Sequence, residues 1–181
     1  EIGRKMSKSL GNSPDPIDLI NTVGADALRF SMIFGTPKGA DVIFSESILE
    51  TGRNFANKMW NAYRFIMMNA ENIEGLPQDN KLQLELADRW IISRLQEVIM
   101  EVRAHYENLR FNDAANAIFK FMWDDFCSGY IELSKDLLDP SAEKERKLTA
   151  KYLPLIHISE PTRLLGNSYA VFALKKKKTT I

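Results

Sequence analysis

Apolar residues recur at a helical spacing through the middle of the chain. Between residues 45 and 70 they return about every 3.6 positions, which predicts a long amphipathic helix with Ser45 as its N-cap. A second such helix is predicted at 84–107. The apolar positions are Ile48, Phe55, Met59, Tyr63 and Ile66 in the first helix, and Trp90, Ile91, Leu95, Val98, Ile99, Val102 and Tyr106 in the second.

A third long helix is predicted from Asn112 or Asp113, as its N-cap, to about residue 138, and another near Ala142. Three long amphipathic helices with short connections predict a helix bundle. The expected fold is therefore mainly α. The inward face of the third helix would consist of Ala115, Ile118, Phe119, Met122, Phe126, Tyr130, Leu133 and Leu137.

Two shorter helices are predicted ahead of this bundle. Residues 1–13 have the composition of a loop, and Asp15 followed by Pro16 is typical of a helix start. Gly24 is a natural end for that helix. A second short helix is predicted at about 25–34.

Composition and charge narrow the function classes. The chain has 181 residues and a net charge of zero, so any nucleic acid would have to bind at a local patch. Its one cysteine, Cys127, excludes an internal disulfide, and with only two histidines it excludes a zinc site of the usual Cys/His type. The sequence contains no apolar run of about 18 residues, so no membrane-spanning helix is expected. A cytoplasmic protein without a membrane partner is expected.

Residues 5–9 have the sequence KMSKS and continue as Leu10, Gly11 and Asn12. This string resembles the KMSKS signature of class I aminoacyl-tRNA synthetases, with the GN extension typical of the valine, isoleucine and leucine enzymes. Lysines in a mobile loop can stabilise the negative charge that builds on departing pyrophosphate. The resemblance implies ATP binding by Lys5, Met6, Ser7, Lys8, Ser9 and Gly11, with Lys8 and Lys5 as the catalytic lysines.

Three further stretches carry the resemblance to about residue 152. Residues 53–65 resemble the RNFxNKxWNAxRF helix of the valine enzymes, which favours valine over isoleucine. Residues 87–95 and 121–135 resemble helices of the anticodon-binding bundle, except that Ser128 and Gly129 replace an acid and a tryptophan. The resemblance implies a tRNA-facing side made of Arg53, Asn57, Lys58, Asn61 and Arg64.

Three aromatic residues of the bundle allow two interpretations. Trp90, Trp123 and Tyr130 could stack on anticodon bases. Their helical phase matches the apolar stripes, which favours core packing. For Cys127, near the stripe and without a basic neighbour, an inert core thiol is expected.

The resemblance implies three segments. Residues 1–45 would end a Rossmann-type catalytic domain, and 46–153 would form part of the anticodon-binding bundle. Residues 154–181 resemble a translated sequencing adaptor with four lysines, Lys175–Lys178, and are expected to be non-native. A natural lysine-rich tail is the alternative.

The implied function is that of a fragment of a valine–tRNA ligase. The intact enzyme would be a monomer using ATP, valine, tRNA(Val) and Mg²⁺. The fragment alone is expected to be inactive, because the HIGH signature and amino-acid pocket of the family are not in the sequence. Two alternatives remain: an isoleucine–tRNA ligase fragment, and a non-catalytic helical RNA-binding or scaffold module.

Overall fold

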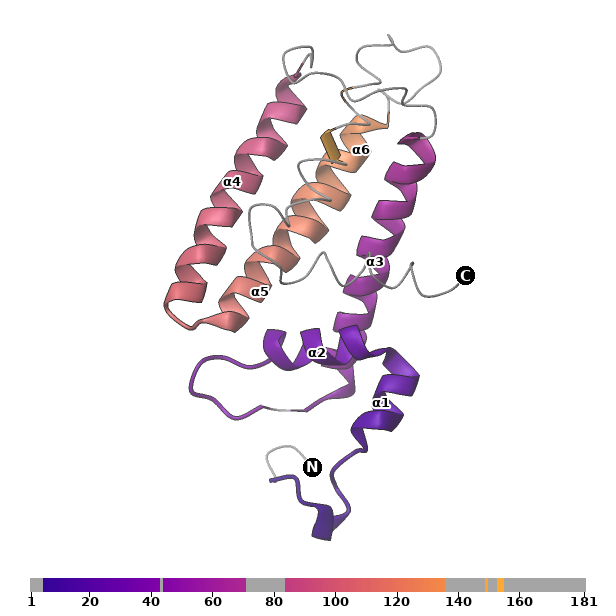
Figure 1. Cartoon of the computed structure of the whole chain (residues 1–181), viewed down its shortest axis with the longest axis vertical. Helices are drawn as coiled ribbons and strands as arrows, with labels where there is room; N and C mark the ends of the chain where they lie inside the picture. The colour runs from indigo at the N-terminus through magenta and orange to yellow at the C-terminus, as the bar shows by residue number, and fades with distance from the viewer. Residues whose placement is uncertain (1–4, 43, 71–83, 136–148, 150–152, 155–181) are drawn as a thin grey trace, which may run out of the picture. The chain divides into compact units, whose positions relative to one another are not determined.

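Helices are the regular secondary structure of the described part of the chain, and loops connect them. The computed structural model describes residues 5–42, 44–70, 84–135, 149, 153 and 154, and no strand occurs among them (Figure 1). The mainly α prediction is confirmed. The predicted helix near Ala142 lies outside the described residues. The elements are the 3₁₀ helix η1 (Lys8–Leu10), α1 (Pro16–Val23), α2 (Ala25–Phe34), α3 (Glu46–Ala70), α4 (Leu86–Glu107), α5 (Phe111–Lys120), the π-helix η3 (Phe121–Tyr130) and α6 (Ile131–Ser134).

Most helix starts agree with the sequence predictions. Asp15 caps α1 by accepting a hydrogen bond of 2.7 Å from the Ile17 N–H, and Pro16 takes the first helical position. Gly24 ends α1 with a φ of 92°, and α2 starts at the next residue. Ser45 caps α3 through the Ile48 N–H at 3.4 Å.

The third long helix differs from its prediction at its start. It begins at Phe111 with Arg110 in the N-cap position, and no side chain caps it. Asn112 and Asp113, the predicted caps, lie in its first turn. Arg110 and Asp113 form an ion pair of 3.9 Å instead.

Its inward face also differs, because the helix changes type. After Lys120 the backbone is π-helical for ten residues, and i→i+5 hydrogen bonds place more residues in each turn than an α-helix does. The buried face therefore shifts along the sequence. Leu133, predicted to point inward, is 58% exposed. The buried residues between 126 and 135 are Phe126, Cys127, Tyr130, Ile131 and Ser134.

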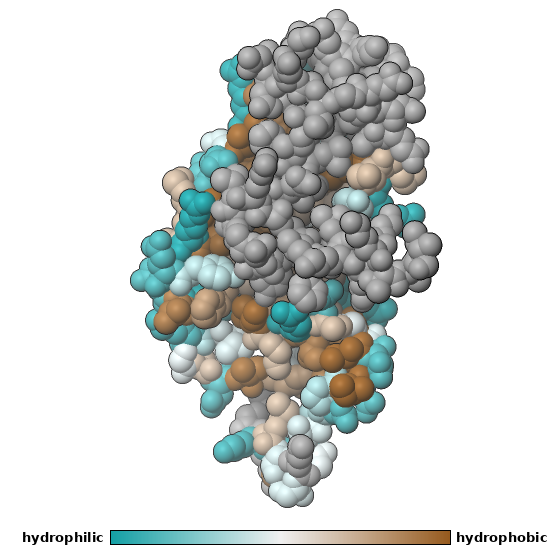
Figure 2. Space-filling view, in the orientation of Figure 1, coloured by the Kyte–Doolittle hydropathy of each residue, from teal (hydrophilic) through white to brown (hydrophobic). Residues whose placement is uncertain are grey.

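The chain divides into two compact units. The first comprises residues 1–60 and 100–123, and the second 61–99 and 124–181. Apolar surface is interspersed with polar surface over the region of α1 and α2 in the first unit (Figure 2), where Ile17 and Met32 are among the exposed apolar side chains.

An aromatic cluster forms much of the core of the first unit. Phe30 and Phe34 from α2 meet Phe55 from α3 and Phe119 from α5, with ring centroids 4.8 Å apart for Phe30 and Phe55 and 4.9 Å for Phe55 and Phe119. Trp123 extends the cluster by stacking on Phe119 at 5.4 Å. Side chains from α2, α3, α5 and η3 therefore form one aromatic cluster.

Close packing of α2 on α3 depends on a glycine. A Cβ atom at Gly52 would lie 2.4 Å from the Ser31 hydroxyl and 2.6 Å from the Ala27 carbonyl oxygen. The Ser31 hydroxyl lies within hydrogen-bond distance of the Ala27 and Ile48 carbonyls, at 2.6 and 2.9 Å. The two helices are thus fixed by backbone approach and by a buried hydroxyl.

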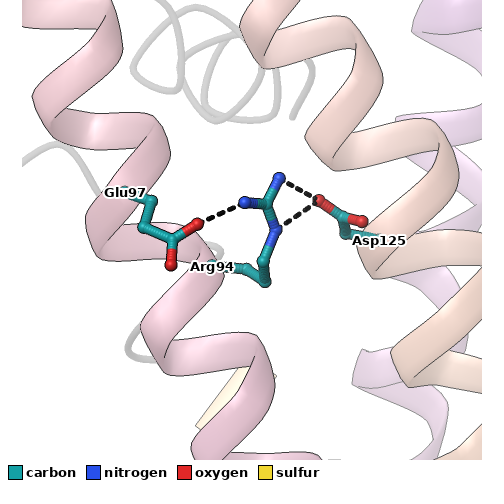
Figure 3. Close-up of polar contacts among 3 residues, drawn as sticks. All are labelled: Arg94, Glu97 and Asp125. Atoms are coloured by element: carbon teal, nitrogen blue, oxygen red, sulfur yellow. Dashed lines mark hydrogen bonds and ion pairs between the residues drawn. The ribbon is translucent and has the colours of Figure 1, made fainter.

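The second unit is organised around α4 and the helix that follows α5. Ile91, Leu95 and Phe126 are buried in it. Arg94 on α4 donates hydrogen bonds of 3.2 and 3.1 Å to one oxygen of Asp125 and also pairs with Glu97 (Figure 3). The Asp125 carboxylate, more than Glu97, raises the pKa of the Arg94 guanidinium.

Two aromatic residues of α4 are more exposed than predicted. Trp90 is 36% exposed and Tyr106 is 41% exposed. The Trp90 ring lies against Gly129, where a Cβ atom would be 3.0 Å from its Cη2. Gly129, which sequence analysis had noted only as a departure, therefore leaves the space that this ring uses.

Candidate functional site

The KMSKS segment is a compact loop rather than an extended strand. Lys8–Leu10 form a single 3₁₀ turn, which the Leu10 N–H closes on the Ser7 carbonyl at 3.1 Å. The hydroxyls of Ser7 and Ser9 are hydrogen-bonded to each other at 2.7 Å. Ser7 and Ser9, two of the predicted ATP-binding residues, therefore lie within one small turn.

Asn12 ties the two ends of this loop together. Its side-chain oxygen accepts a hydrogen bond of 2.8 Å from the Ser7 N–H. Its amide nitrogen donates one of 3.3 Å to the Lys5 carbonyl. We call these two hydrogen bonds the Asn12 latch. The role of Asn12 was not predicted from the sequence, although asparagine side chains commonly form hydrogen bonds to nearby backbone.

Gly11 provides the backbone turn between the 3₁₀ helix and Asn12. Its φ is 62°, in the left-handed region, and a Cβ atom there would meet nothing within 4 Å. The requirement for glycine is thus conformational and not steric.

The loop offers its polar groups to solvent. Lys5, Met6 and Ser9 are exposed, and Ser7 is half-buried. The backbone of Lys8 opens the 3₁₀ turn, and its side chain lies outside what the structure describes. An exposed loop with lysines, hydroxyls and backbone N–H groups can bind phosphate oxygens.

The predicted tRNA-facing residues divide into two groups on α3. Arg53, Asn57, Asn61 and Arg64 are exposed and follow one another at the spacing of a single helix face. Lys58 is half-buried, and its Nζ lies 4.2 Å from the centre of the Trp123 ring. Such a cation–π contact orients the lysine toward the core.

The aromatic residues proposed for base stacking occupy different environments. Tyr130 is 1% exposed, so it belongs to the core. Trp123 is half-buried between Phe119 and Lys58. Cys127 is buried, as expected for a core thiol.

Tyr130 has a buried polar partner that sequence analysis missed. Its hydroxyl donates a hydrogen bond of 2.7 Å to Asp88, which is 1% exposed. The other Asp88 oxygen accepts a bond of 2.9 Å from the Glu85 N–H at the start of α4. Asp88 therefore makes one of the two hydrogen bonds of a capping box, the one to the backbone N–H of the N-cap residue. Its position three residues after the N-cap is the sequence signal from which this role could have been predicted.

Burial dominates the acid–base chemistry of this pair. It raises the pKa of Asp88, and the hydrogen bond from Tyr130 partly opposes that rise. Burial, together with Asp88, also raises the pKa of the Tyr130 phenol. The hydrogen bond of this buried pair joins η3 to α4.

The described residues contain neither a metal-binding cluster nor a membrane-spanning helix. No group of three His, Cys, Asp or Glu side chains there could hold a metal ion. In the same residues, no helix is both long and apolar enough to cross a membrane.

Two family models match this chain. The model of class I tRNA synthetases for isoleucine, leucine, methionine and valine matches residues 1–45, which include the KMSKS loop. The anticodon-binding domain of tRNA ligases matches residues 88–165. The chain belongs to the class I aminoacyl-tRNA synthetases. The first match ends immediately before α3, which starts at Glu46.

The relatives of this class I synthetase chain include several valine–tRNA ligases. That of Fusobacterium nucleatum is 50% identical over 168 residues, which cover 91% of the chain and 19% of the relative. That of Clostridium tetani is 47% identical over 152 residues, covering 83% of the chain and 17% of the relative. The chain thus spans about a fifth of the length of these curated relatives.

A solved synthetase structure shares the fold. The LeuRS–tRNA–LeuAMS ternary complex of Agrobacterium radiobacter K84 matches with a TM-score of 0.59 and 27% identity. The match covers 83% of this synthetase chain and 18% of the solved one. The predicted non-native segment, residues 154–181, stays a prediction, and the anticodon-binding match runs to residue 165.

Proposed function

We propose that this chain is the part of a monomeric, cytoplasmic valine–tRNA ligase that carries the ATP-phosphate loop and part of the anticodon-binding domain. The observation that carries the proposal is the 50% identity to a valine–tRNA ligase over a stretch containing both regions. Relatives of 41–47% identity also have this name, which favours valine over isoleucine. The class I match at the loop argues against a helical scaffold module with a coincidental Lys/Ser string.

The proposed chemistry has two steps. In the first, a valine carboxylate oxygen attacks the α-phosphorus of ATP, forming valyl-adenylate and releasing pyrophosphate. In the second, the 3′-terminal ribose hydroxyl of tRNA(Val) attacks the valyl carbonyl, and AMP leaves. Charge develops on the pyrophosphate in the first step, where Lys8 and Lys5 would stabilise it. Met6, Ser7, Ser9 and Gly11 would shape the loop and supply hydrogen bonds to phosphate oxygens.

Mg²⁺ would enter with the nucleotide. Magnesium usually binds through phosphate oxygens and water with few protein carboxylates. The described residues, which hold no cluster of three possible ligands, fit such a mode.

The tRNA would contact the exposed face of α3. Arg53 and Arg64 can pair with phosphates, and Asn57 and Asn61 can hydrogen-bond to sugar or phosphate. Lys58 would act through its contact with Trp123, by stiffening the helix next to the RNA.

Amino-acid-dependent ATP–pyrophosphate exchange by the full-length protein tests the proposal. We expect exchange with valine and far less with isoleucine. Lys8→Ala should reduce kcat for exchange by about 10²-fold or more, as loss of one group that stabilises transition-state charge does. The exposed Lys120→Ala, on α5, is the matched control and should leave exchange unchanged.

The isolated chain of 181 residues should give no exchange. Exchange that requires isoleucine would assign the protein to the alternative enzyme. The proposed activity would be contradicted if no amino acid supported pyrophosphate exchange by the full-length protein.

A further inference from the structure

The Asn12 latch closes an eight-residue segment that contains both proposed catalytic lysines. The side chain of Asn12 faces a backbone donor at Ser7 and a backbone acceptor at Lys5. An asparagine amide has one acceptor and one donor side, so it matches this pair. Aspartate would present acceptors to both, and alanine would bond to neither.

The latch acts together with two other features of the loop. The left-handed Gly11 turns the chain back so that Asn12 can reach Ser7. The hydrogen bond between the Leu10 N–H and the Ser7 carbonyl then fixes the 3₁₀ turn that begins at Lys8. Ser7 is thus held through both of its backbone polar groups, one by Asn12 and one by Leu10.

We propose that Asn12 is a positioning residue for ATP activation, which holds Lys5 and Lys8 in one preformed loop through its two backbone hydrogen bonds. The inference rests on the proposed function, because it assigns the turn a role in binding ATP phosphates. A loop that is already ordered loses less conformational entropy when it closes on a ligand than a free loop does. Asn12 touches no substrate in this scheme and acts only through the loop backbone.

The latch predicts a specific kinetic pattern. In Asn12→Ala the loop must be ordered by ATP itself, so kcat/KM for ATP should fall by about tenfold or more, the effect of losing one to two hydrogen bonds. The KM for valine should not change, because the loop would hold phosphates and not the amino acid. Asn12→Ser retains a weaker acceptor for the Ser7 N–H and should lie between alanine and wild type.

The test uses the full-length protein with three variants: Asn12→Ala, Asn12→Ser and Asn21→Ala. Asn21 is an exposed asparagine on α1 and serves as the matched control. Pyrophosphate exchange gives KM and kcat for ATP and for valine. Hydrogen–deuterium exchange of peptides covering residues 5–12 reports whether the Ser7 N–H is protected.

The inference is supported by faster deuterium uptake in residues 5–12 of Asn12→Ala together with a loss confined to ATP kinetics. Equal ATP kinetics in Asn12→Ala and Asn21→Ala would overturn it. So would an equal loss for ATP and valine with a lower melting temperature, which indicates a general folding defect. If the wild-type protein gives no pyrophosphate exchange, the proposed function fails. In that case deuterium uptake still tests the latch, because unchanged uptake in Asn12→Ala would reject it as well.

Discussion

At the scale of single residues, Asp88 and Tyr130 show how polar groups are accommodated in the core. Both are 1% exposed, and each satisfies the other, while Asp88 also accepts a backbone N–H at the start of α4. A buried hydroxyl or carboxylate without a partner costs free energy, whereas a bonded one is tolerated. The inward position of Tyr130 could be predicted from the sequence, but its hydrogen bond to Asp88 could not, because the two residues are 42 positions apart.

Tyr130→Phe should destabilise the chain in a pH-dependent way. The Tyr130 bond favours the charged form of Asp88, while burial opposes that form and raises the pKa of the carboxyl group. Since that pKa is above its unfolded value, the stability contributed by protonated Asp88 is present below about pH 4 and is lost as pH rises through the folded pKa. The phenylalanine variant should lose about 1.5–3 kcal/mol at pH 7 and clearly less near pH 4.

Urea unfolding at both pH values measures this difference. Tyr106→Phe, on a side chain that is 41% exposed, is the control and should show little change at either pH. An equal loss of unfolding free energy for Tyr130→Phe at both pH values would mean that the hydrogen bond from the Tyr130 phenol does not depend on the charge of Asp88.

At the scale of helices, periodicity and capping chemistry predicted α1, α2 and α3 to within about a residue, and α4 to within about two. Those predictions rest on local physics, namely the Asp15 and Ser45 caps and the Gly24 turn. The predicted start of the third helix was wrong, and so was Leu133 on its predicted inward face, whereas Phe126 and Tyr130 are buried as predicted. Its N-cap position holds Arg110, which has no capping side chain, and its π-helical stretch does not follow the 3.6-residue period. The exposure of Leu133 could not be predicted without that change of pitch.

Gly52 offers a test of how α2 packs on α3. In an open helix, replacing glycine by alanine stabilises by about 1 kcal/mol. At Gly52 the new methyl group would overlap the Ser31 hydroxyl and the Ala27 carbonyl, so the sign should reverse. We expect Gly52→Ala to destabilise by about 1–3 kcal/mol.

Thermal or urea unfolding compares this variant with Asn54→Ala, an exposed position on the same helix. The control should be neutral or slightly stabilising. A stabilised Gly52→Ala would show that α2 and α3 can separate enough to admit a methyl group at no cost.

At the scale of the whole molecule, the sequence motifs predicted the family, and the contacts within the loop and the core came only from the structure. The KMSKS string and the motif at 53–65 are each an unbroken stretch of sequence, so each can be recognised without knowing the fold. The Asn12 latch and the cation–π contact of Lys58 depend on backbone geometry or on residues distant in sequence. The proposed binding of tRNA to the exposed face of α3 can be tested at this scale, because tRNA is a large polyanion.

Replacing both Arg53 and Arg64 by alanine should weaken tRNA binding by the full-length protein and reduce its salt dependence. Two lost phosphate contacts lower the slope of log K against log salt by roughly 1–2. Filter binding or fluorescence anisotropy at several salt concentrations measures the slope. Lys120→Ala on α5 is the control, and an unchanged slope in the double variant would remove these arginines from the RNA interface.

The π-helical stretch also has an evolutionary consequence. A helix with i→i+5 bonds accommodates additional residues without interrupting its axis, so residues 121–130 can absorb an insertion or deletion that an α-helix could not. Removing one residue there would convert a π turn into an α turn, so the residues that follow, including Ile131, would keep the faces that they present. Among homologous chains, length variation inside this helix should therefore fall between residues 121 and 130, and the apolar positions that follow should keep their spacing.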